Sequence, residues 1–146
     1  MSQENVEIVR RAFEEFTRGG WEPLFDTVWA PEIVWDMSPA GIAGLGTYHG
    51  HAELRSFFED WFSTFPFEEW EQELDDVVDC GDQVVVALTR QRGRGATSGV
   101  SVELEYAQVI TVRESKVVRV VIFTDRKQAL EAVGRSDRST EEGRHG

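Results

Sequence analysis

The fold is decided by residues 87–130, which read ALTRQRGRGATSGVSVELEYAQVITVRESKVVRVVIFTDRKQAL. Apolar and polar residues alternate along this stretch, and the alternation is interrupted by the glycine-rich turn Gly93–Gly99 and by the pair Glu114-Ser115. Alternation with a period of two predicts β-strands, and short turns between strands are typical of antiparallel hairpins. We therefore expect strands over Gln83–Arg94, Val100–Arg113 and Lys116–Asp125, followed by a short helix over Arg126–Val133.

The strand before this stretch is expected over Trp70–Cys80, and Gly81-Asp82 predicts a tight turn into the next strand. Its apolar face is formed by alternate residues, namely Trp70, Gln72, Leu74, Val78 and Cys80. Asp76 falls on this apolar face, which indicates either a β-bulge or a functional acid, and the pattern favours the bulge.

The first half of the chain predicts helices. Apolar residues recur at helical spacing in two segments, at Val9, Ala12, Phe13 and Phe16 in the first and at Leu54, Phe57, Phe58, Trp61, Phe62 and Phe65 in the second. The first segment predicts a helix over Gln3–Arg18, and Pro66 ends the second helix. Between them we expect a short helix over Glu22–Trp29, a strand over Pro31–Asp36 and a glycine-rich loop over Ser38–Gly50.

This order of elements predicts a single α+β domain, with helices covering one face of a curved, mostly antiparallel β-sheet. The domain is expected to span residues 1–133. Residues 134–146 contain no aliphatic or aromatic side chain, so they have no apolar surface to offset the entropy of ordering, and we expect a disordered tail.

Composition excludes several classes of function. The 146-residue chain carries 15 basic and 27 acidic residues, a net charge of −12, which argues against nucleic acid and against anionic lipid as partners. No run of 18 apolar residues exists, so no membrane span is expected. The N-terminus lacks the apolar stretch of a signal peptide, and the single Cys80 excludes an internal disulfide framework, so we expect a cytoplasmic protein.

Three segments of the chain resemble the nuclear transport factor 2-like superfamily, in its branch of SnoaL-like polyketide cyclases. They are GGWEPLFDTVWAPEIVWD (19–36), GTYHGHAELRSFFEDWF (46–62) and residues 87–130, and the resemblance extends over roughly residues 3–133. It implies a cone closed by a helix and a bent sheet, and a homodimer formed through the outer faces of the sheets. This shape hosts isomerases, cyclases, dehydratases, hydrolases and non-enzymatic binders, so the resemblance implies no single activity.

Asp36 is the candidate catalytic residue. A carboxylate at the end of a strand, beside aromatic surface and before a flexible loop, is expected to be partly desolvated, which raises its pKa toward the range of a general base. The related ketosteroid isomerases place a general-base Asp at the matching position. The alternative is a solvated acid that caps the loop. Those isomerases also carry a Tyr in the first helix and an acid in a later strand, where this chain has Phe13 and Tyr106-Ala107-Gln108, so steroid isomerase activity is not expected.

Candidate ligand-binding residues come from several elements. Tyr106 and Gln108 share a strand face with Ile110 and Val112, where a phenol and an amide can orient a ligand; alternatively they lie at a rim or bond to backbone groups. Arg90 could bind an anionic oxygen, although Arg92 and Arg94 on the same face are more simply paired with Glu103 or Glu105. The remaining candidates are Tyr48, Trp61, Phe123 and Asp125.

Two of these remaining residues have a structural alternative. Trp61 can be plain core, and Asp125 is more simply the N-cap of the last helix than a second acid at the pocket mouth. His49 and His51 form a His-x-His pair without a third ligand at a readable spacing, so no metal and no cofactor is expected.

Two functions from different classes follow. The first is a cofactor-independent isomerase, cyclase or hydrolase that uses Asp36 as acid–base on an apolar oxygenated substrate, with Tyr106, Gln108 and Arg90 holding an oxygen. The second is a non-catalytic module that binds a small apolar or aromatic ligand, or that serves dimerisation.

Overall fold

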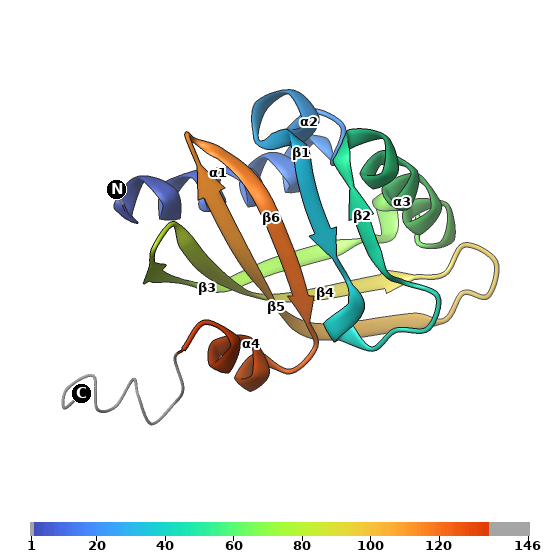
Figure 1. Cartoon of the computed structure of the whole chain (residues 1–146). Coiled ribbons are helices and arrows are strands. Elements are labelled where there is room, and N and C mark those ends of the chain that lie inside the picture. The colour runs from blue at the N-terminus through green and yellow to red at the C-terminus, as the bar shows by residue number, and fades with distance from the viewer. Residues whose placement is uncertain (1, 135–146) are drawn as a thin grey trace.

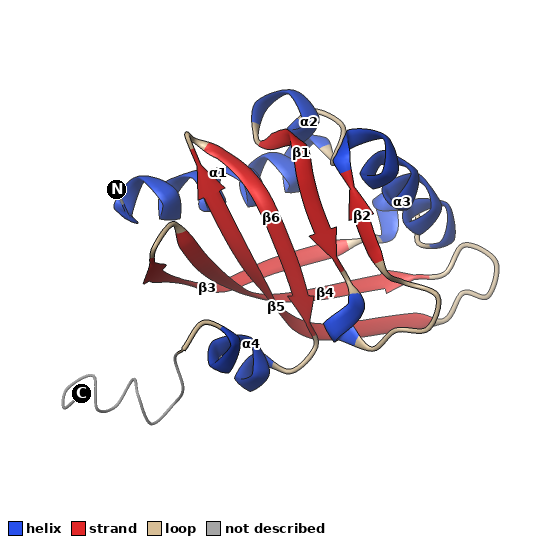
Figure 2. Cartoon of the chain, in the orientation of Figure 1, coloured by secondary structure: helices blue, strands red, loops and turns tan. Residues whose placement is uncertain are grey.

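The computed structural model describes residues 2–134. The tail expected over residues 134–146 therefore lies outside the described residues, except for Gly134. The strands are β1 (Trp29–Asp36), β2 (Thr47–His49), β3 (Glu71–Gly81), β4 (Val84–Arg94), β5 (Ser101–Arg113) and β6 (Lys116–Phe123). The helices are α1 (Ser2–Gly19), α2 (Leu24–Thr27), α3 (Gly50–Thr64) and α4 (Arg126–Ala132), with the single 3₁₀ turns η1 (Ser38–Ala40) and η2 (Phe67–Glu69) (Figures 1 and 2).

The six strands form one sheet in the order β2-β1-β6-β5-β4-β3. Every neighbouring pair is antiparallel except β1 and β6, which run parallel. The long strands β3, β4 and β5 curve across the molecule, while β1 and β6 lie side by side and run in the same direction (Figure 1). The predicted α+β class with a curved, mostly antiparallel sheet is confirmed.

One short strand lies where a loop was expected. β2 pairs with β1 so that Tyr48 faces Trp35, and the backbone N–H of Met37 donates to the carbonyl of Gly46 at 2.8 Å. Three residues are too few to show an alternating pattern, which is why the sequence did not predict this strand. The expected helix over Glu22–Trp29 is also shorter, because Trp29 already pairs with Val117 of β6.

Two tight hairpin turns set the register of the long strands. Asp82 and Gln83 between β3 and β4, and Glu114 and Ser115 between β5 and β6, all have positive φ angles. Two successive residues with positive φ are the signature of the turn whose twist matches that of paired strands. The first turn is centred one residue later than the expected Gly81-Asp82.

A bulge in β3 changes which side chains face the helices. Leu74 pairs with Thr89 and Asp76 with Leu88, so Asp75 has no partner in the β4 register, which confirms the predicted bulge. Because one extra residue reverses the alternation, Val78 and Cys80 lie on the outer face with Val86, not on the face of Leu74. The expectation that one face holds all of these residues is wrong.

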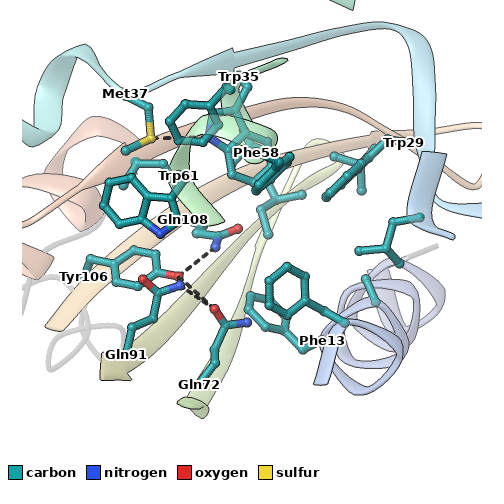
Figure 3. Close-up of a pocket in the computed structure, with 18 of the residues that line it drawn as sticks. Phe13, Trp29, Trp35, Met37, Phe58, Trp61, Gln72, Gln91, Tyr106 and Gln108 are labelled. Atoms are coloured by element: carbon teal, nitrogen blue, oxygen red, sulfur yellow. Dashed lines mark hydrogen bonds between the residues drawn. The ribbon is translucent and has the colours of Figure 1, made fainter. Parts of the chain in front are cut away.

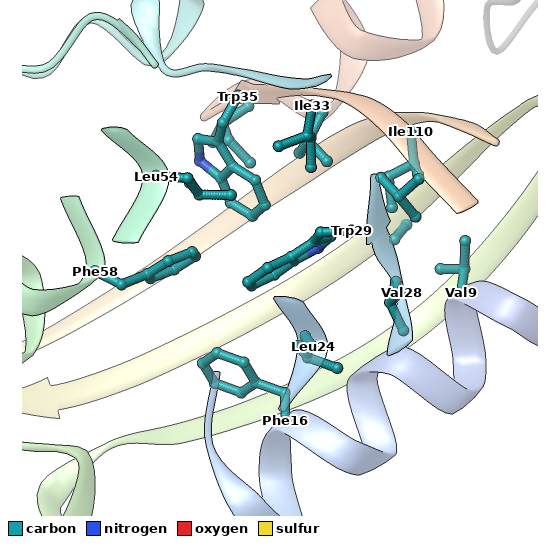
Figure 4. Packing of buried hydrophobic residues seen from close by; sticks show 14 of the residues in the cluster. Val9, Phe16, Leu24, Val28, Trp29, Ile33, Trp35, Leu54, Phe58 and Ile110 are labelled. Atoms are coloured by element: carbon teal, nitrogen blue, oxygen red, sulfur yellow. The ribbon is translucent and has the colours of Figure 1, made fainter. Parts of the chain in front are cut away.

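The core lies in two layers. The larger cluster lies between α1, α3 and the inner face of the sheet, with Val9, Leu24, Ile33 and Leu54 fully buried in it (Figure 4). A smaller cluster on the outer face joins Val86 and Ala107 to Ala129 of α4. No helix within residues 2–134 is both long and apolar enough to cross a membrane.

Candidate functional site

A cavity lies between the inner face of the sheet and the helices α1 and α3. The volume of this cavity is about 110 Å³. Its wall is largely aromatic and aliphatic, with Phe13 and Phe16 from α1, Trp29 and Trp35 from β1, and Phe58 and Trp61 from α3 (Figure 3). The helical spacing of the apolar residues in α1 and α3 is what brings these rings to one side.

The aromatic wall is held by ring contacts. Phe58 stacks on Trp29 with ring centroids 5.2 Å apart and planes 4° apart, and it meets Trp35 edge to face at 5.3 Å. The indole N–H of Trp35 donates to the sulfur of Met37 at 3.2 Å, so this indole carries its own partner (Figure 3). The wall therefore offers ring faces and edges for a flat apolar molecule.

Four polar side chains meet at one end of the cavity. The hydroxyl of Tyr106 donates to Gln72 Oε1 at 3.3 Å and accepts from Gln108 Nε2 at 3.3 Å, and Gln91 Nε2 donates both to this hydroxyl and to Gln72 Oε1 (Figure 3). Strands β3, β4 and β5 supply the four residues in register, since Gln72 pairs with Gln91 and Thr89 with Tyr106. We call Gln72, Gln91, Tyr106 and Gln108 the amide–tyrosine cluster.

The cluster leaves hydrogen-bonding groups without a partner among the described residues. The Tyr106 hydroxyl has one hydrogen, and this hydrogen goes to Gln72, so the phenol oxygen can only accept from Gln108. The amide nitrogen of Gln108 therefore faces Tyr106, and its carbonyl oxygen is turned away from Tyr106 toward the interior of the cavity (Figure 3). Neither Gln108 Oε1 nor Gln72 Nε2 has a hydrogen-bond partner within residues 2–134.

Tyr106 is a neutral phenol in this setting. Burial raises the pKa of Tyr106 to about 12, because the phenolate would lose its hydration, and the hydrogen bond from Gln108 to the phenol oxygen only partly opposes this. It is the only residue with an ionisable side chain among the described residues that line the cavity.

We expect the raised pKa of Tyr106 to make the protein lose stability in strong base. The folded state binds the phenolic proton more tightly than the unfolded state, so this contribution is fully present below pH 10 and is lost as the pH rises toward 12. The loss in the free energy of unfolding should be about 2 to 3 kcal/mol. Tyr48→Phe leaves Tyr106 as the single tyrosine, and its tyrosinate absorbance should appear only well above pH 10 or together with unfolding. Ionisation at an ordinary phenol pKa in a folded protein would contradict this.

Asp36 lies outside the cavity. Trp35 lines it, and the next residue on the strand points to the opposite face of β1. Asp36 Oδ1 accepts hydrogen bonds from the backbone N–H of Ser38 at 2.9 Å, from the Ser38 hydroxyl at 2.6 Å and from the Thr47 hydroxyl at 3.0 Å. Partial burial acts to raise its pKa, but these hydrogen bonds and the charge of Arg119 outweigh it, so the pKa of Asp36 is lowered. The expectation of a raised pKa is wrong, and the geometry matches a loop cap.

The other candidates divide between the cavity and the surface. Trp61, Tyr106 and Gln108 line the cavity, and Tyr48 lies beyond its wall, stacked on Phe57 at 4.8 Å. Arg90 is on the outer face, where its guanidinium bonds to Asp75 at 3.0 Å, so it does not line the cavity in which it was a candidate to bind an anionic oxygen. It faces outward because Val85, Ala87, Thr89 and Gln91 form the inner face of β4.

Phe123 and Asp125 also lie away from the cavity. Phe123 packs in the outer cluster beside α4, and Asp125 is the N-cap of that helix, accepting from the backbone N–H groups of Lys127 at 2.9 Å and Gln128 at 3.4 Å. The cap is the simpler of the two roles that the sequence allowed for Asp125.

The two histidines do not come together at a metal site. His51 Nε2 lies 2.9 Å from the carbonyl of Trp29, while His49 lies beside Glu53, with Nδ1 3.8 Å from its carboxylate. Within the part of the chain that the structure describes, no group of three or more His, Cys, Asp or Glu side chains could hold a metal ion.

Gln72 and Gln91 were not predicted as site residues. A signal was available, because Gln72 lies between Trp70 and Leu74 on an apolar face and Gln91 follows Ala87 and Thr89 on another. An amide on a buried face needs a hydrogen-bond partner, so two such amides on neighbouring strands indicate a shared polar site.

Comparison with known proteins gives the relatives of the fold. A putative SnoaL-like polyketide cyclase from Jannaschia sp. CCS1 is 21% identical with a TM-score of 0.70, covering 90% of this chain and 92% of its own. An NTF2-like protein of unknown function from Burkholderia pseudomallei K96243 is 23% identical with a TM-score of 0.68, covering 89% and 97%. The protein TerC, co-crystallised with polyporic acid, is 18% identical with a TM-score of 0.69, covering 90% and 98%.

At these identities the solved structures establish a shared fold. No curated protein matches the chain significantly. The SnoaL-like domain family, in contrast, matches residues 9–120, which include α3 and all of the strands except the end of β6. The predicted resemblance is thereby confirmed, and the chain belongs to the SnoaL-like domain family.

Proposed function

We propose that this SnoaL-like domain binds a small ring-containing molecule that carries one polar oxygen. The ring lies against the aromatic wall, and the oxygen lies at the amide–tyrosine cluster. The observation that carries the proposal is the separation of the lining into a large apolar wall and a single polar end. This is the arrangement by which pockets combine apolar burial with a few oriented hydrogen bonds.

The size of the cavity sets the size of the ligand. An apolar cavity of about 150 Å³ is known to take up benzene. The volume of about 110 Å³ here therefore accommodates roughly one six-membered ring, with a modest movement of the wall. Half-buried side chains such as Trp61 and Phe62 are the parts of the wall that can move most easily to enlarge the cavity.

The proposal is a binding function without a chemical step. Acid–base catalysis needs a side chain that exchanges protons near the working pH within reach of the ligand. Among the described residues that line the cavity there is no Asp, Glu, His, Lys, Arg or Cys, and Tyr106 holds its proton up to a pKa of about 12. What these residues supply is orientation of an oxygen by amide groups and exclusion of water by aromatic rings.

We expect p-cresol to bind more tightly than toluene, because only p-cresol has a hydroxyl to pair with the cluster. Gln108→Leu should weaken p-cresol by about 3- to 10-fold, the worth of one hydrogen bond, and leave toluene nearly unchanged. Isothermal titration calorimetry measures both affinities. Asp36→Asn is the matched control and should change neither, since Asp36 lies outside the cavity. Equal affinity for the two compounds, or a loss of p-cresol binding in Asp36→Asn, would contradict the proposal.

A homodimer through the outer face of the sheet stays a prediction. Part of the apolar outer face is already covered within one chain, because α4 packs over Val86 and Ala107. Sedimentation equilibrium at micromolar concentration tests the dimer directly, and a monomer under those conditions would refute it.

A further inference from the structure

We propose that the cavity selects neutral hydroxyl compounds and rejects the corresponding anions. The inference rests on the proposed function, because it names the class of molecule that the same cavity accepts. It is carried by three independent features: the absence of a counter-charge in the described lining, the direction of the free amide groups, and the charge of the adjoining surface groove.

The described lining offers no positive charge to an anion. It contains no Lys, Arg or His, and the basic side chains nearest in sequence to the cluster are engaged elsewhere, since Arg90 bonds to Asp75 on the outer face. Moving a carboxylate or phenolate from water into such a site removes its hydration without replacing it, which is costly unless a partner charge is present. A neutral hydroxyl avoids this penalty.

The amide–tyrosine cluster also favours a donor over an anion. Because the hydrogen of Tyr106 goes to Gln72, the carbonyl oxygen of Gln108 is turned toward the cavity, and it can only accept. A ligand hydroxyl can donate to this oxygen while its own oxygen accepts from another amide. A deprotonated ligand has no hydrogen to donate, and its negative oxygen would face the negative end of the Gln108 carbonyl.

A surface groove lies on the other side of the wall made by Phe57 and Trp61, because both residues line the groove as well as the cavity. The groove carries two carboxylate side chains, Glu53 and Asp60, and no basic side chain among its described lining residues. Together with the net charge of −12, these carboxylates make the surface on the outer side of this wall unfavourable for anions.

The first test uses 4-nitrophenol, which ionises near neutral pH and whose anion is yellow. If the cavity prefers the neutral form by tenfold or more, saturating protein should raise the apparent pKa of the dye by about one unit or more and bleach the yellow band. Gln108→Leu should reduce this shift, because it removes the carbonyl oxygen that accepts the hydrogen of the bound hydroxyl. An unchanged or lowered dye pKa in the presence of bound dye would overturn the inference.

The second test compares 4-methylbenzyl alcohol with 4-methylbenzoate at neutral pH by calorimetry. Both present the same ring, and the alcohol should bind at least about tenfold more tightly. Comparable affinities would overturn the selectivity and leave the proposed function standing, since a ring compound would still bind. If 4-methylbenzyl alcohol, p-cresol and 4-nitrophenol all fail to bind at any pH, the proposed function itself is overturned.

Discussion

Phe58→Ala should lower the free energy of unfolding by about 3 to 5 kcal/mol, the usual cost of deleting a buried phenylalanine. Phe58 is 5% exposed and stands at the centre of the aromatic wall. Its ring stacks on Trp29 at 5.2 Å and on Trp21 at 5.6 Å, and it meets Trp35 edge to face at 5.3 Å. Alanine would remove these three ring contacts. It would also leave an empty space, because the backbones of α3 and β1 cannot move together to close it.

The matched control is Phe65→Ala. Phe65 follows the end of α3, is half-buried, and contacts Trp61 at 5.1 Å and Trp70 at 5.9 Å. It should cost roughly 1 to 2 kcal/mol, because less apolar surface is lost from the interior. Both values come from urea unfolding monitored by circular dichroism. A cost for Phe58→Ala equal to or below that of Phe65→Ala would contradict the central position of the Phe58 ring.

Gly93→Ala is expected to cost about 2 to 3 kcal/mol, a large effect for a single methyl group. A Cβ at Gly93 would lie 2.4 Å from Cε3 and 2.6 Å from Cζ3 of Trp70, much closer than carbon atoms pack. Trp70 is buried between Trp61, Phe62 and Phe65, so its ring cannot move aside without disturbing the wall. The glycine is required by this close approach and not by its backbone angles.

Gly95→Ala is the control for this prediction, since there the new Cβ would meet only the end of the Ser98 side chain at 2.6 Å, which can rotate away. It should change the free energy of unfolding by less than about 1 kcal/mol. In a Trp70→Leu background the cost of Gly93→Ala should largely vanish, and the double-mutant cycle measures this coupling. An equal cost in both backgrounds would show that the indole is not the cause.

Much of the fold followed from local patterns. The spacing of Phe13 and Phe16, and of Phe57, Phe58 and Trp61, placed α1 and α3 within a few residues, because an amphipathic helix repeats its apolar face every 3.6 residues. The alternation in β5 placed Tyr106 and Gln108 on one face, and both line the cavity. Asp125 was recognised as a cap because capping depends on the next few residues only.

Other features depended on contacts between distant segments. In β4 both faces are apolar, with Val84, Val86 and Leu88 on one and Val85 and Ala87 on the other, so alternation could not tell which face is inside. Arg90 was therefore chosen as a candidate ligand-binding residue although it faces outward, and Gln91, which occupies the inner face, was overlooked. The role of Asp36 as a loop cap depended partly on Thr47, whose hydroxyl reaches the carboxylate only because β2 pairs with β1.

The sequence alone determined the order of the helices and of the strands other than β2, the family resemblance and the aromatic character of the interior, because these depend on residue type and on spacing along the chain. The tertiary structure decided that Asp36 lies outside the cavity, that Arg90 faces outward and that Gln72 and Gln91 join Gln108 at the Tyr106 hydroxyl. The physical reason is that the direction of a strand face is set by sheet pairing and helix cover, and pairing joins segments that lie far apart in the sequence.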